Sequence, residues 1–257
     1  MKTIVLANNK GGVGKTTSVL NIADALVGRG HSVLLIDADQ QGNLTQSFTY
    51  NPPAARTLAS VLLGRTDLAD AVQEVRPDQP GLYLLPAGAD LNDAVAKRAE
   101  QPGAELVLRK LLAGARLDYC LIDTPGSMGK LTDAALTAAD AVFIPAHPEV
   151  YGVKGLVELI QRCRLIQDGL NPGLRVGGLF FTQYNRADRR LVLRNMVGVL
   201  EGHAVLGPLV MRQTIRDNVA VKEAQDQKAS LYAYAPDCAA AADYAVLTAE
   251  LLGRLHS

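Results

Sequence analysis

The sequence reads Asn-Asn-Lys-Gly-Gly-Val-Gly-Lys-Thr-Thr at residues 8–17, directly after a short apolar run at residues 3–7. Three glycines within four positions let the backbone curl with its N–H groups turned inward, as a bound polyanion requires. Residues 16–27 have helical spacing, so the positive end of a helix would face the same anion. This order of strand, glycine-rich turn and helix predicts a phosphate-binding loop, with Lys15 as a point charge and the Thr16 hydroxyl placed for Mg²⁺.

The ordinary phosphate-loop pattern, G-x-x-x-x-G-K-[ST], would have its first glycine where this chain has Asn9. The chain instead carries a second lysine, Lys10, at the start of the loop, in the form KGGVGKTT known as a deviant Walker A motif. On these residues the chain resembles the ParA/MinD group of P-loop ATPases. Its later segments resemble the ParA/Soj branch, namely Pro145-Ala146-His147-Pro148-Glu149 with Gly155-Leu156, and Tyr234-Ala235-Pro236-Asp237 with Ala241, Asp243 and Tyr244. The resemblance implies that Lys10 and Lys15 are catalytic and that Lys10 reaches the nucleotide of a partner subunit. It also implies that ATP is bound by Lys10, Gly11, Gly12, Val13, Gly14, Lys15, Thr16 and Thr17.

Two further apolar runs end in aspartate. Residues 31–36 lead into Asp37-Ala38-Asp39, and residues 119–122 lead into Asp123, the Walker B arrangement. The carboxyl ends of parallel strands face the ligand crevice of such a sheet, so we expect these carboxylates beside the phosphate-binding loop. Asp123 would reach Mg²⁺ through water, because Mg²⁺ tends to keep several waters. The alternatives are a solvated acidic turn at 37–39 and a turn-capping role for Asp123.

The second loop of the family usually reads D-x-D-P-Q-G-N, and residues 37–43 match this pattern except that Gln40 replaces the proline. By this resemblance Asp39 is catalytic and positions the attacking water. The same resemblance gives Asp37 a place in the outer shell of the metal. The predicted metal residues are therefore Thr16, Asp37 and Asp123.

Strands alternate with helical segments along the whole chain, which predicts a parallel sheet with right-handed crossovers. We expect one α/β domain over residues 1–257, with a doubly wound, mostly parallel sheet and the P-loop NTPase fold. Further strands are expected at 82–86, 141–145, 176–182 and 205–211. Further helices are expected at 57–63, 67–75, 89–116 with a break near 102–103, 130–139, 153–167, 189–200 and 236–255.

Composition restricts the function. The formal net charge is zero, so affinity for nucleic acid must come from a local patch. The three cysteines, Cys120, Cys163 and Cys238, are widely spaced and form no CxxC pair, which favours reduced thiols and a cytoplasmic protein and disfavours a cluster-binding iron protein. The sequence has neither a signal-peptide core nor a run of about 20 apolar residues that could span a bilayer. The sequence begins at its first strand, so we expect no helix-turn-helix extension before it.

Residues 175–230 hold nine basic and five acidic residues. Arg186, Arg190 and Arg194 are spaced by four, so one helix containing all three would align them along a phosphate backbone. ParA-like proteins bind double-stranded DNA without sequence preference through arginines of this region, which makes Arg186, Arg189, Arg190, Arg194, Arg212 and Arg216 the candidates. A solvated helix face is the alternative. Met211 stands where the family usually has a proline against the adenine, and is the candidate base contact.

Together these features predict an ATPase that partitions plasmid or chromosomal DNA. The resemblance implies an ATP-bound sandwich homodimer on nucleoid DNA, released when a ParB-like centromere-binding protein stimulates hydrolysis, with ATP and Mg²⁺ as cofactors. One alternative is a ParA-like positioner of protein cargo. Another is a MinD-like membrane-positioning ATPase, but residues 247–257 carry only one fixed cation, Arg254, so we expect no membrane binding.

Overall fold

The computed structural model describes residues 1–48, 53, 55–76, 79–148, 152–187 and 189–256. A seven-stranded sheet forms its centre, in the order β3-β4-β2-β5-β1-β6-β7. All neighbouring strands are parallel except β3, which runs antiparallel to β4 at one edge. The strands are β1 (Lys2–Leu6), β2 (Val33–Asp37), β3 (Gln73–Glu74), β4 (Leu82–Leu85), β5 (Tyr119–Asp123), β6 (Ala141–Ala146) and β7 (Arg175–Phe181). The predicted doubly wound α/β fold is confirmed.

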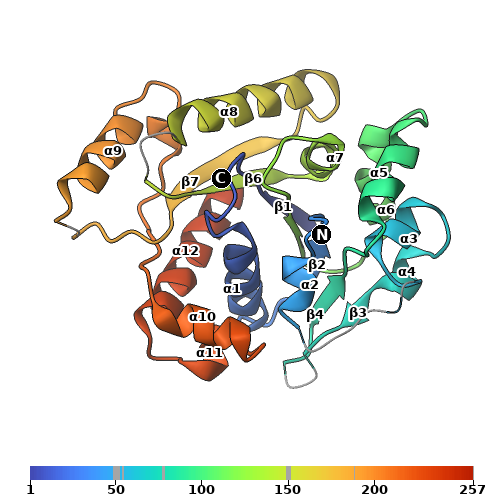
Figure 1. The fold of residues 1–257 in the computed structure, drawn as a ribbon, viewed down its shortest axis with the longest axis horizontal. Helices are drawn as coiled ribbons and strands as arrows, with labels where there is room; N and C mark the ends of the chain where they lie inside the picture. Colours follow the sequence, from blue (N-terminus) through green and yellow to red (C-terminus); the bar gives the residue numbers. More distant parts are fainter. Residues whose placement is uncertain (49–52, 54, 77–78, 149–151, 188, 257) are drawn as a thin grey trace.

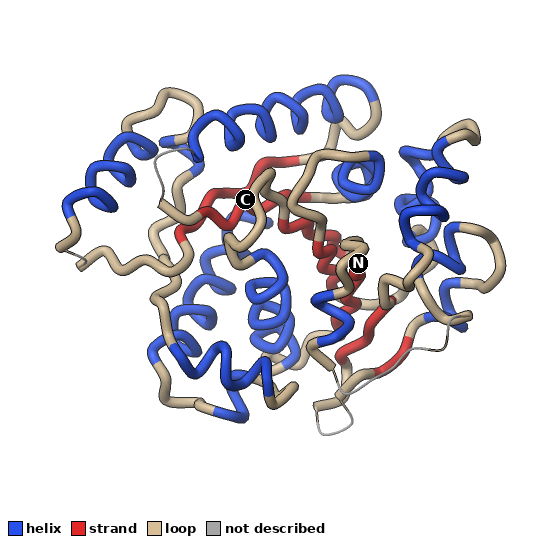
Figure 2. Tube along the Cα trace, in the orientation of Figure 1, coloured by secondary structure: helices blue, strands red, loops and turns tan. Residues whose placement is uncertain are grey.

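Helices cover both faces of the sheet (Figures 1 and 2). One face packs against α1 (Lys15–Val27), α2 (Asn43–Gln46), α10 (Val219–Asp226), α11 (Leu231–Tyr234) and α12 (Ala239–His256). The other face packs against α3 (Leu58–Leu62), α5 (Leu91–Ala99), α6 (Val107–Leu112), α7 (Lys130–Ala138), α8 (Gly152–Gly169) and α9 (Leu191–Glu201). The short elements are α4 (Leu68–Ala71), η1 (Ala104–Leu106) and η2 (Gly207–Leu209).

The alternation of strand side chains separates the core into two layers. Ile4 and Leu35 belong to the layer with α1 and α12, whereas Val5 and Ile36 belong to the layer with α7 and α8. Because successive side chains of a strand point to opposite faces, nearly continuous apolar strands serve both layers. The central strands are therefore fixed from both sides, and their carboxyl ends meet at one edge.

Two sequence predictions were wrong. Residues 205–211 form no strand: η2 occupies their middle, and along β7 the segment makes one isolated bridge, between Leu179 and Val210, rather than a ladder. Pro208 lacks the N–H that a ladder needs, which favours the tight turn. Residues 67–75 are helical only in α4, because the chain then pairs as β3 with β4.

The interruption predicted near residues 102–103 is confirmed. Helix α5 ends at Ala99, and Gly103 adopts a left-handed φ of 72° before η1 and α6 follow. At the end of the chain, α12 runs as one continuous helix. Its buried side chains, which include Leu247, Leu251 and Leu255, face the core beside α1.

Candidate active site

The phosphate-binding loop joins β1 to α1 at the carboxyl edge of the sheet. Gly12 and Gly14 adopt left-handed φ values of 75° and 81°, a region that side-chain-bearing residues rarely occupy. Gly14 also lies against Thr182, whose hydroxyl donates to the carbonyl of Val13 at 2.9 Å. A Cβ on Gly11 or Gly12 would meet nothing within 4 Å, so the inside of the turn is open. The loop is thus held from outside and open toward a ligand.

The two lysines of this loop lie differently. Lys15 is buried and donates from Nζ to the carbonyl of Lys10 at 3.1 Å. Burial lowers the pKa of Lys15, although the charges of Asp123 and Asp39 oppose that shift. The side chain of Lys10 is exposed on the outer part of the loop. Lys15 can therefore neutralise an anion inside the cavity, whereas Lys10 is accessible to a second molecule.

Asp123 ends β5 directly beside the first turn of α1. The Thr16 hydroxyl donates to its Oδ2 at 2.6 Å, and the carboxyl group is fully buried. Burial raises the pKa of Asp123 to about 7, against the opposing effects of the Thr16 hydrogen bond and the Lys15 charge. Its Oδ1 is buried and accepts no hydrogen bond within the described part of the chain. An orphaned carboxylate oxygen beside a threonine hydroxyl is a donor set that suits Mg²⁺ and its waters.

Asp37 and Asp39 have separate surroundings. Asp37 is fully buried, and its Oδ2 accepts from both the N–H and the hydroxyl of Thr45, at 2.8 and 2.6 Å. Burial raises the pKa of Asp37 to about 6. Its Oδ1 accepts from the N–H of Asp39 at 3.1 Å. Asp37 thereby holds the loop that carries Asp39, and only Asp39 of the two lines the cavity.

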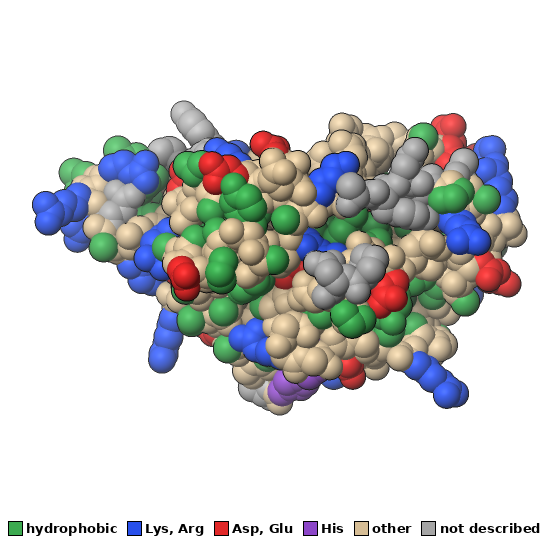
Figure 3. Space-filling model, turned by 90° about the horizontal axis from the view of Figure 1, so that it is seen from below, with side chains coloured by type: hydrophobic (Ala, Val, Ile, Leu, Met, Phe, Trp, Pro, Cys, Tyr) green, Lys and Arg blue, Asp and Glu red, His purple; other side chains and the backbone are tan. Residues whose placement is uncertain are grey.

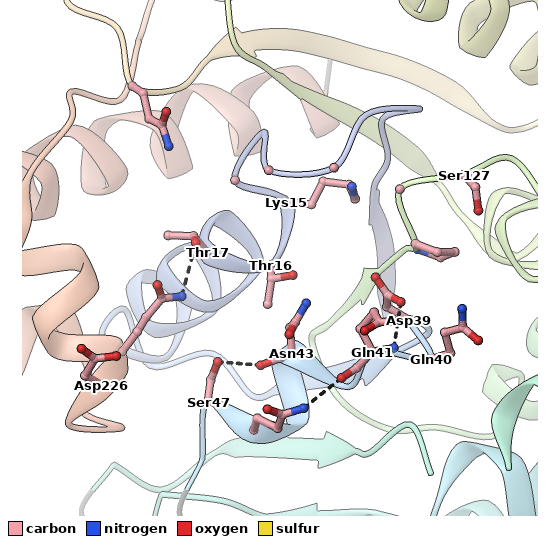
Figure 4. Close-up of a pocket in the computed structure, with 18 residues that line it drawn as sticks. Lys15, Thr16, Thr17, Asp39, Gln40, Gln41, Asn43, Ser47, Ser127 and Asp226 are labelled. Atoms are coloured by element: carbon pink, nitrogen blue, oxygen red, sulfur yellow. Dashed lines mark hydrogen bonds between the residues drawn. The ribbon is translucent and has the colours of Figure 1, made fainter. Parts of the chain in front are cut away.

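A cavity of about 670 Å³ lies in front of the loop (Figure 4). Of the predicted residues, Gly11, Gly12, Gly14, Lys15, Thr16, Thr17 and Asp39 line it, and Lys10, Val13, Asp37 and Asp123 do not. The sequence had indicated no role for the other lining residues, which include Asn43, Pro125, Gly126, Ser127, Gln183 and Gln225. Gly126 packs closely on the phosphate-binding loop, since a Cβ there would lie 3.2 Å from the Gly11 nitrogen.

A smaller hollow of about 110 Å³ adjoins this cavity and shares Gly14, Thr17, Gln183 and Gln225 with it. Met211, the predicted base contact, is fully buried against Gly178 and lines neither hollow. The smaller hollow is lined instead by residues 215–218, which lie after Met211 in the sequence. The Asn218 side chain caps α10 by accepting from the N–H of Ala220. A helix predicted from the amphipathic pattern of residues 219–226 would have pointed to this part of the site.

The candidate arginines fall into two groups. Arg186 lies outside α9 and pairs with Glu201 at 3.0 Å, so the expected single stripe of three arginines is not formed. Arg216 donates from Nε and Nη2 to the Asp243 carboxylate at 2.8 and 2.7 Å. The second group lies at and before the start of α9 or after η2 and consists of Arg189, Arg190, Arg194 and Arg212; all four are exposed, as is Arg186. Lys and Arg side chains gather at the left end of Figure 3, the end that carries α9 in Figure 1.

Comparisons with known proteins agree with this geometry. A family model described as an AAA domain matches residues 1–176. The chain is 36% identical over 255 residues to the chromosome-partitioning ATPase Soj of Treponema pallidum, covering 98% of each protein. It is also 36% identical to the chromosome partitioning protein ParA of Caulobacter vibrioides, covering 99% of this chain and 95% of that protein. The chain belongs to the ParA/Soj family of P-loop ATPases.

Solved structures place this ParA/Soj family member among nucleotide-binding proteins. Cobyrinic acid a,c-diamide synthase of Mycobacterium smegmatis, solved with ADP and magnesium, is 29% identical, with a TM-score of 0.81 over 100% of this chain and 96% of that chain. An aspartate-to-alanine variant of Cyanothece McdA, solved with ATP, is 26% identical, with a TM-score of 0.85 over 98% and 96% of the two chains.

Proposed function

We propose that this ParA/Soj family member partitions plasmid or chromosomal DNA by binding and hydrolysing ATP with Mg²⁺. The observation that carries the proposal is the convergence of Lys15, Thr16 and the orphaned Asp123 oxygen at one open glycine loop. The residues fit the nucleotide, because a buried cation and inward N–H groups suit its phosphates. Bound Mg²⁺ would neutralise charge developing on the phosphates during transfer.

Each residue of the site has a defined part in this proposal. Lys15 would face the phosphates, and the Thr16 hydroxyl would be a direct ligand of Mg²⁺. Asp123 would support the metal through water, because its Oδ2 accepts from the Thr16 hydroxyl while its Oδ1 accepts no hydrogen bond within the described residues. Asp39 lines the cavity from the second loop and orients the attacking water. Asp37 acts on the site through the Asp39 backbone that it holds.

ATP binding would also create a dimer. Lys10 is exposed at the loop and does not line the cavity of its own subunit, which favours a role toward the nucleotide of a partner subunit. A two-fold dimer presents every surface arginine twice. Hydrolysis, stimulated by a ParB-like centromere-binding protein, would then return the protein to monomers.

The exposed arginines near α9 form the proposed contact to nonspecific double-stranded DNA. Arg189, Arg190 and Arg194 are exposed at and before the start of α9. The guanidinium groups of Arg186 and Arg216 pair with Glu201 and Asp243. Three arginines per subunit would give about six phosphate contacts per dimer, and hence a slope of log affinity on log salt near about −5. Contacts of this kind carry no sequence information.

The membrane-positioning alternative is less well supported. The closing helix α12 buries Leu247, Leu251 and Leu255 against the core, so its apolar face is already used. None of the helices in the described part of the chain combines the length and apolar character that a bilayer-spanning segment needs.

Filter binding across a salt series on two unrelated duplexes tests the DNA proposal. Binding should require ATP, should be equal on both duplexes, and should show the expected salt slope. Changing Arg190 and Arg194 to Glu should weaken binding equally on both duplexes and flatten the slope, with ATP binding intact. Unchanged DNA affinity in this variant would refute the assignment, and a strong preference for one duplex would refute nonspecific binding.

A further inference from the structure

The loop that carries Asp39 closes as a tight turn. The N–H of Gly42 donates to the carbonyl of Asp39 at 3.0 Å, which makes Gln40 the second residue of a four-residue turn. The N–H of Gln41 donates to the Asp39 Oδ1 at 3.0 Å (Figure 4). Proline is favoured at the second position of such turns because its ring fixes φ near −65°. The backbone geometry therefore accounts for the proline of the family pattern, and this chain lacks that constraint.

Gln40 has a different restraint in this chain. The Asn92 side chain donates from Nδ2 to Gln40 Oε1, and Asn92 lies in the first turn of α5. Helix α5 is itself anchored, because Leu91 and Ala94 are buried against α3 and α7. The contact thus connects a polar turn at the nucleotide cavity to a fixed element on the opposite face of the sheet.

The space behind the turn makes this contact important. A hollow of about 520 Å³ lies on the side of the turn away from the phosphate-binding loop. Gln40, Gln41 and Gly42 line it from the turn, and Arg65 and Asp90 line it from the other side as an ion pair of 3.0 Å. The turn is consequently bounded by open space on both sides. Gln46 of α2, the helix that directly follows the turn, donates from Nε2 to the Gln41 carbonyl at 2.9 Å. The Asn92 bond differs because it comes from an element distant in sequence, so it can fix the turn relative to the rest of the fold.

We propose that Asn92 is a positioning residue for ATP hydrolysis. By holding Gln40, it fixes the turn that begins at Asp39 and so takes over the part played by proline in the family pattern. The proposal rests on the role of Asp39 given above. It does not make Asn92 a contact of the nucleotide, because Asn92 does not line the main cavity.

Steady-state hydrolysis at saturating Mg²⁺, measured in two backgrounds, tests the proposal. In the wild-type background, Asn92→Ala should lower kcat roughly 3- to 10-fold, the effect of losing one hydrogen bond, with the KM for ATP unchanged. In the Gln40→Pro background, Asn92→Ala should change nothing, since proline holds the turn without a partner. Asp93→Ala, the adjacent exposed position on the same helix, is the matched control and should leave kcat at the wild-type value.

Unchanged kcat for Asn92→Ala overturns the proposal, as does an equal loss in both backgrounds. If Gln40→Pro does not fold, the cycle of Gln40→Ala, Asn92→Ala and the double variant replaces it. The double variant should then be no slower than either single variant, and additive losses would overturn the proposal. Asp39→Ala is run in parallel: if it hydrolyses ATP normally, the role of Asp39 is wrong, a failure distinct from that of Asn92.

Discussion

The variant Asp123→Asn should change the pH dependence of the free energy of unfolding in the ligand-free protein, and should separately abolish hydrolysis. The pKa of Asp123 rises from 3.8 to about 7, chiefly because the group is buried. Between these two values the folded protein holds more protons than the unfolded chain, so the free energy of unfolding falls as pH rises. For one such carboxyl, the loss between about pH 5 and about pH 8 is about 2–3 kcal/mol. Asparagine removes this titration while keeping an acceptor for the Thr16 hydroxyl.

Urea unfolding of both proteins in EDTA, at about pH 5 and about pH 8, measures the effect. The wild type should lose about 2–3 kcal/mol more than Asp123→Asn over that interval. The comparison removes the contribution of Asp37, whose pKa is also raised, because both proteins contain it. The variant should nevertheless lose Mg²⁺-dependent hydrolysis. Equal pH dependence in the two proteins would show that Asp123 is not the group that titrates.

Four other variants test separate parts of the protein. Lys15→Ala should weaken ATP binding roughly 100-fold by equilibrium titration, because it removes the buried cation; Lys10→Ala should bind ATP as a monomer but fail to dimerise, and an equal loss of monomer affinity would contradict a role toward the partner. Asp39→Ala should accumulate an ATP-bound dimer on size-exclusion chromatography, and a monomer hydrolysing at the wild-type rate would contradict its role. Arg216→Ala should lower the free energy of unfolding by about 1 kcal/mol through loss of its Asp243 pair, and an unchanged urea midpoint would show that the pair does not stabilise the fold.

The phosphate-binding loop and the core strands could be predicted because their determinants are local. A glycine-rich turn between a strand and a helix forms an anion-binding loop from residues that are adjacent in sequence. Apolar runs such as residues 119–122 can pair in only a few ways within a parallel sheet. Asp123 was predictable for the same reason, since it ends one of those strands.

The remainder depends on tertiary contacts. Whether Asp37 faces a metal or the Thr45 hydroxyl is decided by how α2 folds back over β2. The prediction for Met211 came from a two-residue match, which carries no information on the bridge from Ile215 to Thr182 that brings residues 215–218 to the smaller hollow. Likewise, the pairing of Arg216 with Asp243 joins residues 27 positions apart.

Residues 210–215 cover part of the outer edge of β7, through hydrogen bonds as well as isolated bridges. The N–H groups of Met211 and Ile215 donate to the carbonyls of Leu179 and Phe181 at 2.7 and 2.8 Å. The opposite edge, β3, is two residues long and antiparallel. Open edge strands are templates for uncontrolled association, and proteins protect themselves with short edges and covering segments. Copies of this protein are therefore poor templates for amyloid-like stacking, and can crowd together without their sheets joining.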